Sequence, residues 1–207
     1  MESSVWFTFF AASWAISLSP GPGAVAAMSA GLAHGFHRGY WLTAGLVLGI
    51  VTQLAIVAVG LGALMAASGV AFTVLKWLGV AYLVWLGVQQ WRSDAAPVRG
   101  DDAPAATTRR ALVLRGWAIN AVNPKGTVFM LAVVPQFIDP HAPLALQYAA
   151  IGATLVFTDL VVMAGYTALA ARVLAALRSP RHLRWMNRGF GALFVVAGAL
   201  LATFKRA

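Results

Sequence analysis

Two stretches of this sequence place helix-breaking residues beside groups that could hold an ion. The first, SLSPGPGAV, covers residues 17–25, and the second, NPKG, covers residues 123–126. Proline resists a helix interior and glycine loosens it, while a helix that restarts after a break presents free N–H groups that attract anions such as carboxylates. We therefore predict a substrate-binding site made of Pro20, Gly21, Pro22, Gly23, Ala24, Asn123, Pro124 and Lys125.

One acidic residue, Asp159, falls deep inside an apolar segment. A charge at that depth costs about 2.5–3.5 kcal/mol on insertion scales, and such residues usually mark function. Lys125 could balance Asp159, or it could hold a substrate carboxylate directly. A carboxyl group held between desolvation and a nearby cation can change protonation as its surroundings alternate. We expect Asp159 to couple transport to protons, to bind a substrate ammonium, or to do each in turn; a structural ion pair with Lys125 is the alternative.

The composition is that of a membrane protein. Hydrophobic residues make up 60% of the 207 residues and charged residues only 10%, whereas a soluble domain carries about 25% charged residues. The net charge of +9 raises the question of nucleic-acid binding, but the basic residues stand at the ends of apolar runs, which fits membrane topology better. The absence of cysteine excludes disulfides, thiolate metal sites and dithiol redox chemistry.

Six apolar segments are long enough to cross a bilayer, which takes about 20 residues. They are expected over residues 5–33, 40–66, 70–91, 111–134, 144–173 and 185–204. The start of the chain lacks the basic region of a cleaved signal peptide, so we expect the first segment to be a permanent span. Most Lys and Arg residues fall on one set of connections, which the positive-inside rule places in the cytoplasm, with both termini outside.

Three matches along the chain indicate an internal repeat. They pair Pro20 with Pro124, Thr52 with Thr158, and Lys76 with Arg184. A copy with an odd number of spans re-enters the membrane upside down, and inverted repeats with broken helices recur in transporters. The predicted fold is all-α: a six-helix transmembrane bundle with broken first and fourth helices. It forms a single membrane domain over residues 1–207, with inverted three-helix repeats at 5–91 and 111–204 and a cytoplasmic loop at 92–110.

The middle of four segments carries either a helix break or a polar residue. These features are Ser19–Pro20, Gln53, Asn123–Pro124 and Asp159. We expect them to meet at one depth in a polar pocket, with Gln53 and Asn120 as supporting polar residues. Taken singly, a proline break is more often a simple kink, Gln53 an interhelical hydrogen-bonding group, and the glycines of residues 45–62 close-packing sites.

Four stretches resemble the LysE/RhtB family of bacterial amino-acid exporters. They are SLSPGPGAV, VLKWLGVAYLVWLGVQQWR, NPKGTVFMLAVVPQFI and NRGFGALFVVAGALL, and the likeness runs over about residues 6–205. The second and third most resemble the homoserine and homoserine lactone exporters of that family. The resemblance implies an inner-membrane protein with six helices that exports neutral amino acids or their derivatives by proton antiport. The family commonly has Asn where Gly23 stands, and many members have Asp near Gln53.

We therefore predict a secondary-active, multi-pass exporter of homoserine, its lactone or threonine-like amino acids in the bacterial inner membrane. Its expected partners are the substrate, protons and lipid; the packing glycines would serve a homodimer as well as a monomer. We expect no cofactor, metal or nucleic acid. We also expect no enzymatic activity, since the serines of the first break lack a buried histidine base. The alternatives are a metal-ion exporter and a non-transporting membrane scaffold.

Overall fold

Eight α-helices and one short 3-10 helix make up the part of the chain that the computed structural model describes, which is residues 3–67, 69–92, 108–139, 141–170 and 180–203. No residue in these ranges forms a β-strand, so this part of the protein is all-helical, as predicted. The helices are α1 (Ser3–Leu18), α2 (Pro22–Gly39), α3 (Trp41–Ala67), α4 (Gly69–Arg92), α5 (Arg109–Ala121), α6 (Pro124–Val133), η1 (Val134–Phe137, the 3-10 helix), α7 (Leu144–Ala168) and α9 (Pro180–Thr203).

The first apolar segment is broken at residues 19–21, between α1 and α2. Gly21 is the N-cap of α2 and has extended backbone angles, with φ −146° and ψ −172°. Pro22 opens α2, where a residue without an N–H costs the helix nothing. The first segment was predicted to end near residue 33, and α2 is interrupted close to that point, where Gly35 has a non-helical φ of 70° and ψ of 174°. A short helical piece then continues to Gly39.

The second break, at residues 122–123, separates α5 from α6. Asn123 is the N-cap of α6, and Pro124 is its first residue. The fourth segment was predicted to end at residue 134, but it continues as η1 to Phe137. The predicted loop at 92–110 lies mostly outside the described residues: Arg92 ends α4 and Arg109 begins α5. The last residues of the predicted fifth and sixth segments lie outside them too, while α9 starts earlier than predicted, at Pro180.

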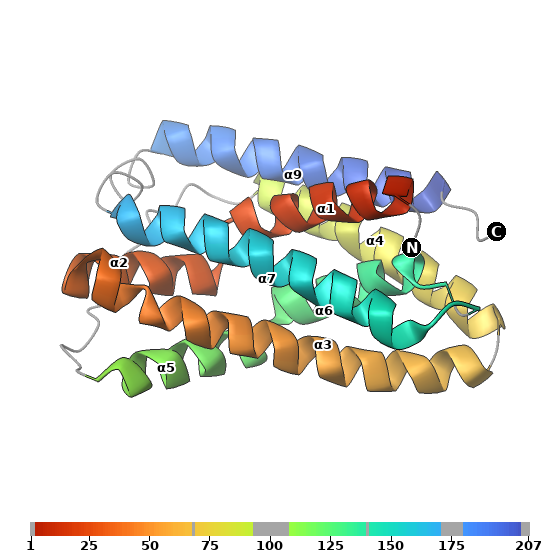
Figure 1. Ribbon diagram of the computed structural model, residues 1–207. Helices are drawn as coiled ribbons and strands as arrows, with labels where there is room; N and C mark the ends of the chain where they lie inside the picture. Colours follow the sequence, from red (N-terminus) through yellow and green to blue (C-terminus); the bar gives the residue numbers. More distant parts are fainter. Residues whose placement is uncertain (1–2, 68, 93–107, 140, 171–179, 204–207) are drawn as a thin grey trace.

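The helices run along one common direction, and each broken pair lies end to end (Figure 1). α1 and α6 occupy one half of the length of the molecule and α2 and α5 the other, so both breaks fall near its middle. α3 and α7 run unbroken past these breaks. Polar groups at the centres of α3 and α7 are thereby brought to the same level as the two breaks.

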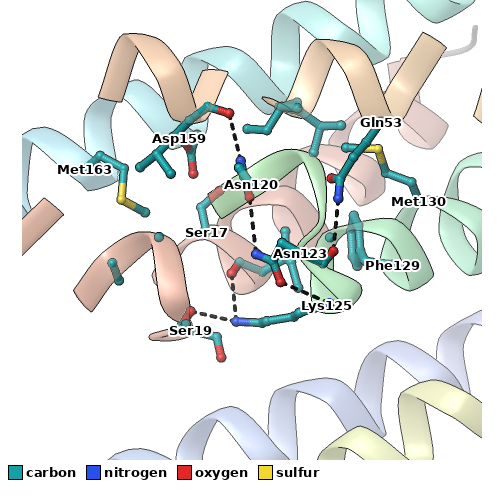
Figure 2. A pocket seen from close by; sticks show the side chains of 18 residues that line it. Ser17, Ser19, Gln53, Asn120, Asn123, Lys125, Phe129, Met130, Asp159 and Met163 are labelled. Atoms are coloured by element: carbon teal, nitrogen blue, oxygen red, sulfur yellow. Dashed lines mark hydrogen bonds between the residues drawn. The ribbon is translucent and has the colours of Figure 1, made fainter. Parts of the chain in front are cut away.

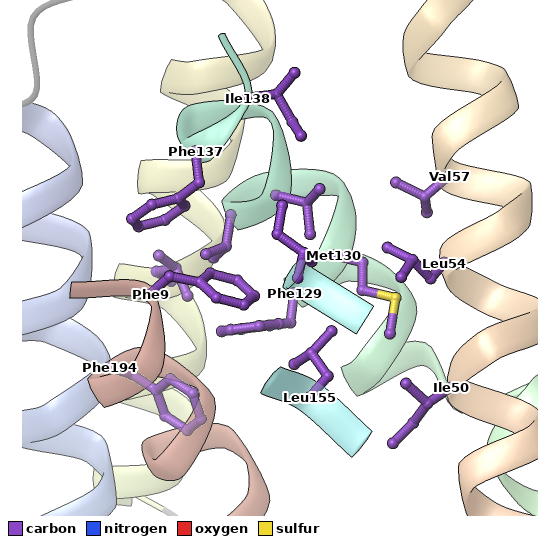
Figure 3. Close-up of a cluster of buried hydrophobic side chains, with 14 residues drawn as sticks. Phe9, Ile50, Leu54, Val57, Phe129, Met130, Phe137, Ile138, Leu155 and Phe194 are labelled. Atoms are coloured by element: carbon purple, nitrogen blue, oxygen red, sulfur yellow. The ribbon is translucent and has the colours of Figure 1, made fainter. Parts of the chain in front are cut away.

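Apolar side chains fill the space on one side of the breaks. The main buried cluster joins α1, α3, α4, α6, η1, α7 and α9, and Figure 3 shows Phe9, Phe129 and Phe137 at its centre. The rings of Phe9 and Phe137 meet edge to face with centroids 5.2 Å apart, a geometry that aromatic pairs prefer. This cluster fixes α1 against α6 and so holds the two broken helices together.

Two of the described helices are long and apolar enough to cross a bilayer by their length and composition. They are residues 41–60 of α3, with a mean hydropathy of 2.3, and α7, with a mean hydropathy of 1.6. The breaks divide the first and fourth segments into shorter pieces, so α1 counts only as a shorter apolar helix over residues 5–18. Outward-facing side chains of α3 include exposed Leu48, Ile56 and Val59, as expected for a helix that meets lipid.

Candidate functional site

A polar pocket lies where the two breaks meet. It has a volume of about 80 Å³, and since a single water needs about 10–15 Å³ of such space, it has room for a compact polar solute. Its walls come from α1, α2, α3, α5, α6 and α7 (Figure 2). Eight of the eleven residues predicted for the site line this pocket: Gly21, Gly23, Ala24, Gln53, Asn120, Asn123, Lys125 and Asp159.

The three predicted prolines, Pro20, Pro22 and Pro124, do not line the pocket. Pro22 and Pro124 contribute indirectly, because each is the first residue of a helix whose first turn faces the pocket. Ser19, which the sequence placed at the depth of the first break, lines the pocket as well. The other lining residues were not predicted: Ile16, Ser17, Leu46, Ile50, Gly126, Phe129, Met130, Leu155 and Met163. Met163 could have been predicted from the sequence, because it follows Asp159 by one helical turn and therefore shares its face of α7.

Lys125 caps the end of α1. Its Nζ donates to the backbone oxygen of Ser19 at 2.6 Å and to that of Ile16 at 3.4 Å. The last carbonyl groups of a helix lack intrahelical partners and carry partial negative charge, so a cation is favourable there. Tyr166 of α7 adds a hydrogen bond from its hydroxyl to Leu18 O at 2.7 Å. The carbonyl groups freed by the first break are thus held by Lys125 and Tyr166.

Asn123 and Asn120 organise the second break. The Asn123 side-chain oxygen accepts from the N–H of Lys125 at 3.1 Å, which caps α6. Its Nδ2 donates to Asn120 Oδ1 at 3.2 Å, and Asn120 Nδ2 donates in turn to Leu46 O on α3 at 2.8 Å. This chain of hydrogen bonds ties both sides of the break to α3 and directs the first turn of α6 toward the pocket.

Gln53 joins α3 to the same break. Its Nε2 donates to the backbone oxygen of Asn123 at 2.9 Å and to Thr127 Oγ1 at 2.7 Å. The interpretation of Gln53 as an interhelical hydrogen-bonding group is therefore confirmed. Gln53 also lines the pocket, and its Oε1 is buried without a hydrogen-bond partner.

Asp159 lies on the opposite side of Asn120 from Lys125 in the view of Figure 2. Asp159 is only 7% exposed, and its Oδ2 has no hydrogen-bond partner. Lys125 makes contacts with backbone oxygens and forms no salt bridge with Asp159, although the structure describes both residues. Lys125 and Asp159 are thus not joined by a direct ion pair, and the contacts of Lys125 are with the end of α1.

The first turn of α2 presents backbone donors to the pocket. No side chain caps this helix, and the first regular hydrogen bond runs from Val25 N–H to Gly21 O at 3.0 Å. Pro22 has no N–H, so the open donors of this turn are those of Gly23 and Ala24, both buried and both lining the pocket. These two groups are suited to a carboxylate or a carbonyl oxygen.

Apolar helices that bury a polar pocket between two helix breaks are the arrangement of a membrane transporter. Comparison with protein families makes this class specific. Residues 14–204 match the family model described as LysE type translocator. The chain therefore belongs to the LysE family, as its sequence motifs indicated.

Relatives of the chain carry names of efflux proteins. A homoserine/homoserine lactone efflux protein of Salmonella typhimurium is 41% identical over 202 residues, which are 98% of this chain and 98% of the relative. An uncharacterized membrane protein of Vibrio cholerae is 42% identical over 99% of this chain and its own full length. A leucine efflux protein of Enterobacter is 28% identical over 96% of this chain and 95% of its own. No solved structure gives a significant match.

Proposed function

We propose that this protein exports small amino acids and their derivatives across the bacterial inner membrane, with homoserine, homoserine lactone and threonine-like compounds as substrates. Export is secondary-active, and one or more protons move inward as the substrate moves outward. The observation that carries the proposal is the buried, unpaired carboxyl group of Asp159 in a pocket between two helix breaks. A charge at such a place is costly, so its presence favours a transport role.

The roles of the pocket residues follow from their chemistry. The open N–H groups of Gly23 and Ala24 donate to an oxygen of the substrate, which belongs either to a carboxylate or to a carbonyl group. Asp159 exchanges protons between the two sides of the membrane as the pocket opens to each in turn. Asn120, Asn123 and Gln53 hold the second break in shape. Lys125 fixes the end of α1. Its charge lies beside the pocket and forms no salt bridge with Asp159.

We further propose that the fold is two inverted repeats, each of which crosses the membrane three times. Support comes from the directions of the helices: α1 starts at one end of the molecule and α5 at the other, although both begin a broken pair (Figure 1). Moving one repeat against the other would open the pocket alternately to each side.

The test uses inverted membrane vesicles that contain the protein. In these vesicles export appears as uptake, and an acidic interior drives protons out as substrate enters. We expect labelled homoserine to accumulate faster with an acidic interior than without a gradient. Equal uptake in both conditions would reject proton antiport, and no uptake above protein-free vesicles would reject homoserine as a substrate.

Export profiling gives an independent check of the substrate class. Cells that overproduce the protein should accumulate homoserine or threonine outside the cell, while cells with the empty vector should not. The two alternatives give different results: a metal-ion exporter would raise metal tolerance without changing extracellular amino acids, and a membrane scaffold would change neither.

A further inference from the structure

The pocket contains buried side-chain oxygens that have no hydrogen-bond partner. Three pocket-lining side chains have a buried atom without a hydrogen-bond partner: Ser19 Oγ, Gln53 Oε1 and Asp159 Oδ2. All three are oxygens that can accept a hydrogen bond. Buried polar atoms are nearly always paired, and an exception requires an explanation such as an absent ligand. The Ser19 hydroxyl can also donate, but a ligand that satisfies Gln53 Oε1 and an ionised Asp159 Oδ2 must supply donors.

Each nitrogen of the pocket side chains, in contrast, already donates at least one hydrogen bond. Lys125 Nζ is held by two carbonyl groups of α1, and the side-chain amides of Asn120 and Asn123 donate to Leu46 O and Asn120 Oδ1. Gln53 Nε2 donates to the backbone oxygen of Asn123. Because that oxygen can only accept, it fixes the orientation of the Gln53 side-chain amide and directs Gln53 Oε1 away from Asn123. Lys125, the cation among the pocket-lining residues, therefore uses two of its three N–H groups on the end of α1.

Asp159 is the one of these three side chains that can carry a charge, so it determines which ligand charge the pocket favours. Asp159 is more than nine-tenths buried and forms no salt bridge among the described residues. A buried carboxylate gains most from a cationic donor, and a primary ammonium group supplies three donors and a positive charge. The open N–H groups of Gly23 and Ala24 can be satisfied by any carbonyl oxygen, so they do not require a charged carboxylate.

We propose that the pocket recognises its substrate by the ammonium group, which Asp159 binds, and that a free carboxylate is dispensable. The substrate class is then small primary ammonium compounds, including those in which the carboxyl group is masked as a lactone, ester or amide. This inference rests on the proposed function and names the part of the substrate that the site selects. It also makes the ammonium group and a proton compete for one carboxyl group.

Binding of labelled homoserine to the purified protein in detergent tests the proposal with two analogues. Homoserine amide keeps the ammonium and lacks the carboxylate, whereas 2,4-dihydroxybutyrate keeps the carboxylate and has a hydroxyl in place of the ammonium. We expect the amide to displace homoserine at a concentration within about tenfold of unlabelled homoserine itself. The dihydroxy acid should need about tenfold to a hundredfold more than the amide, because it lacks the hydrogen bond between charged groups.

Variants provide the second readout. Asp159→Asn should lose binding of homoserine and of its amide by about the same factor, on the order of tenfold or more. Asp139→Asn is the matched control, because Asp139 is the other acidic residue that the structure describes and lies exposed outside the pocket. Elution of each variant as a single symmetrical peak from a sizing column shows that it is folded.

Displacement by the dihydroxy acid with none by the amide would overturn the ammonium proposal and leave homoserine export intact. Unchanged binding of the amide to a folded Asp159→Asn variant would overturn it as well. A complete absence of homoserine binding to the unmodified protein would overturn the proposed function, and the ammonium proposal with it.

Discussion

Lys125 uses its charge on the protein backbone. Its Nζ contacts the oxygens of Ser19 and Ile16, which end α1, so one side chain from the second break holds the carbonyl groups that the first break sets free. The helix end carries partial negative charge that a cation offsets. Lys125 therefore links the two broken helices directly, and any motion of one relative to the other must lengthen or break this contact.

Replacing Lys125 by Met should lower the thermal stability of the protein, because the carbonyl groups of Ser19 and Ile16 lose their donor and remain in the pocket wall. Losing a hydrogen bond from a charged group costs about 1.5–3 kcal/mol. Thermal unfolding in detergent measures the effect. Lys125→Arg keeps the charge and the donors, so it should retain more of the stability than the Met variant. A Met variant that unfolds at the temperature of the unmodified protein would contradict this role.

At the level of elements, the sequence predicted the two breaks because their cause is local. Pro20, Pro22 and Pro124 cannot donate within a helix, and α2 and α6 both begin at a proline. The pocket followed from placing Gln53 and Asp159 at the depth of these breaks. The partner of Lys125 could not be predicted, since Ile16 and Ser19 offer backbone oxygens that no residue type signals. The kink at Gly35 was missed for a similar reason, because only its backbone angle distinguishes it.

Close contact between α3 and α5 depends on glycine. A Cβ at Gly45 would meet the backbone oxygen of Val113, and a Cβ at Gly116 would meet that of Leu42. The same contact brings Asn120 against α3, since a Cβ at Gly49 would lie 2.6 Å from the Cβ of Asn120. The glycines of α3 therefore set the position of a residue that holds the pocket in shape.

Gly45→Ala should destabilise the protein by about 1–3 kcal/mol, the usual cost of forcing extra atoms into a packed contact. Gly60→Ala is the control on the same helix, because nothing lies within 4 Å of a Cβ at that position. The fraction of protein that remains soluble and monodisperse after heating compares the two variants. The explanation fails if both variants tolerate the same temperature.

At the scale of the whole molecule, the basic residues gather at one end. The starts of α5 and α9, which contain the basic residues of 109–110 and 181–188, lie at the end of the molecule to which α2 also runs (Figure 1). The start of α1 and the end of α9 lie at the opposite end. From the positive-inside rule we expect the basic end to face the cytoplasm.

Labelling with a membrane-impermeant thiol reagent tests this orientation, and the absence of natural cysteine makes each introduced thiol unique. His141→Cys, in the exposed turn before α7, should react in intact cells. Arg110→Cys, exposed near the start of α5, should react only after the cells are broken. The reverse pattern would show that the protein is inserted the other way round.

The most direct test of the account is gradient-driven transport by the Asp159→Asn variant. Inverted vesicles with an acidic interior would carry the unmodified protein, Asp159→Asn or Asp139→Asn at equal amounts, and the initial rate of labelled homoserine uptake would be measured with and without the gradient. The account predicts that the gradient accelerates uptake by the unmodified protein and by Asp139→Asn, and leaves uptake by Asp159→Asn unchanged. Gradient-driven uptake by Asp159→Asn at the rate of the unmodified protein would contradict it.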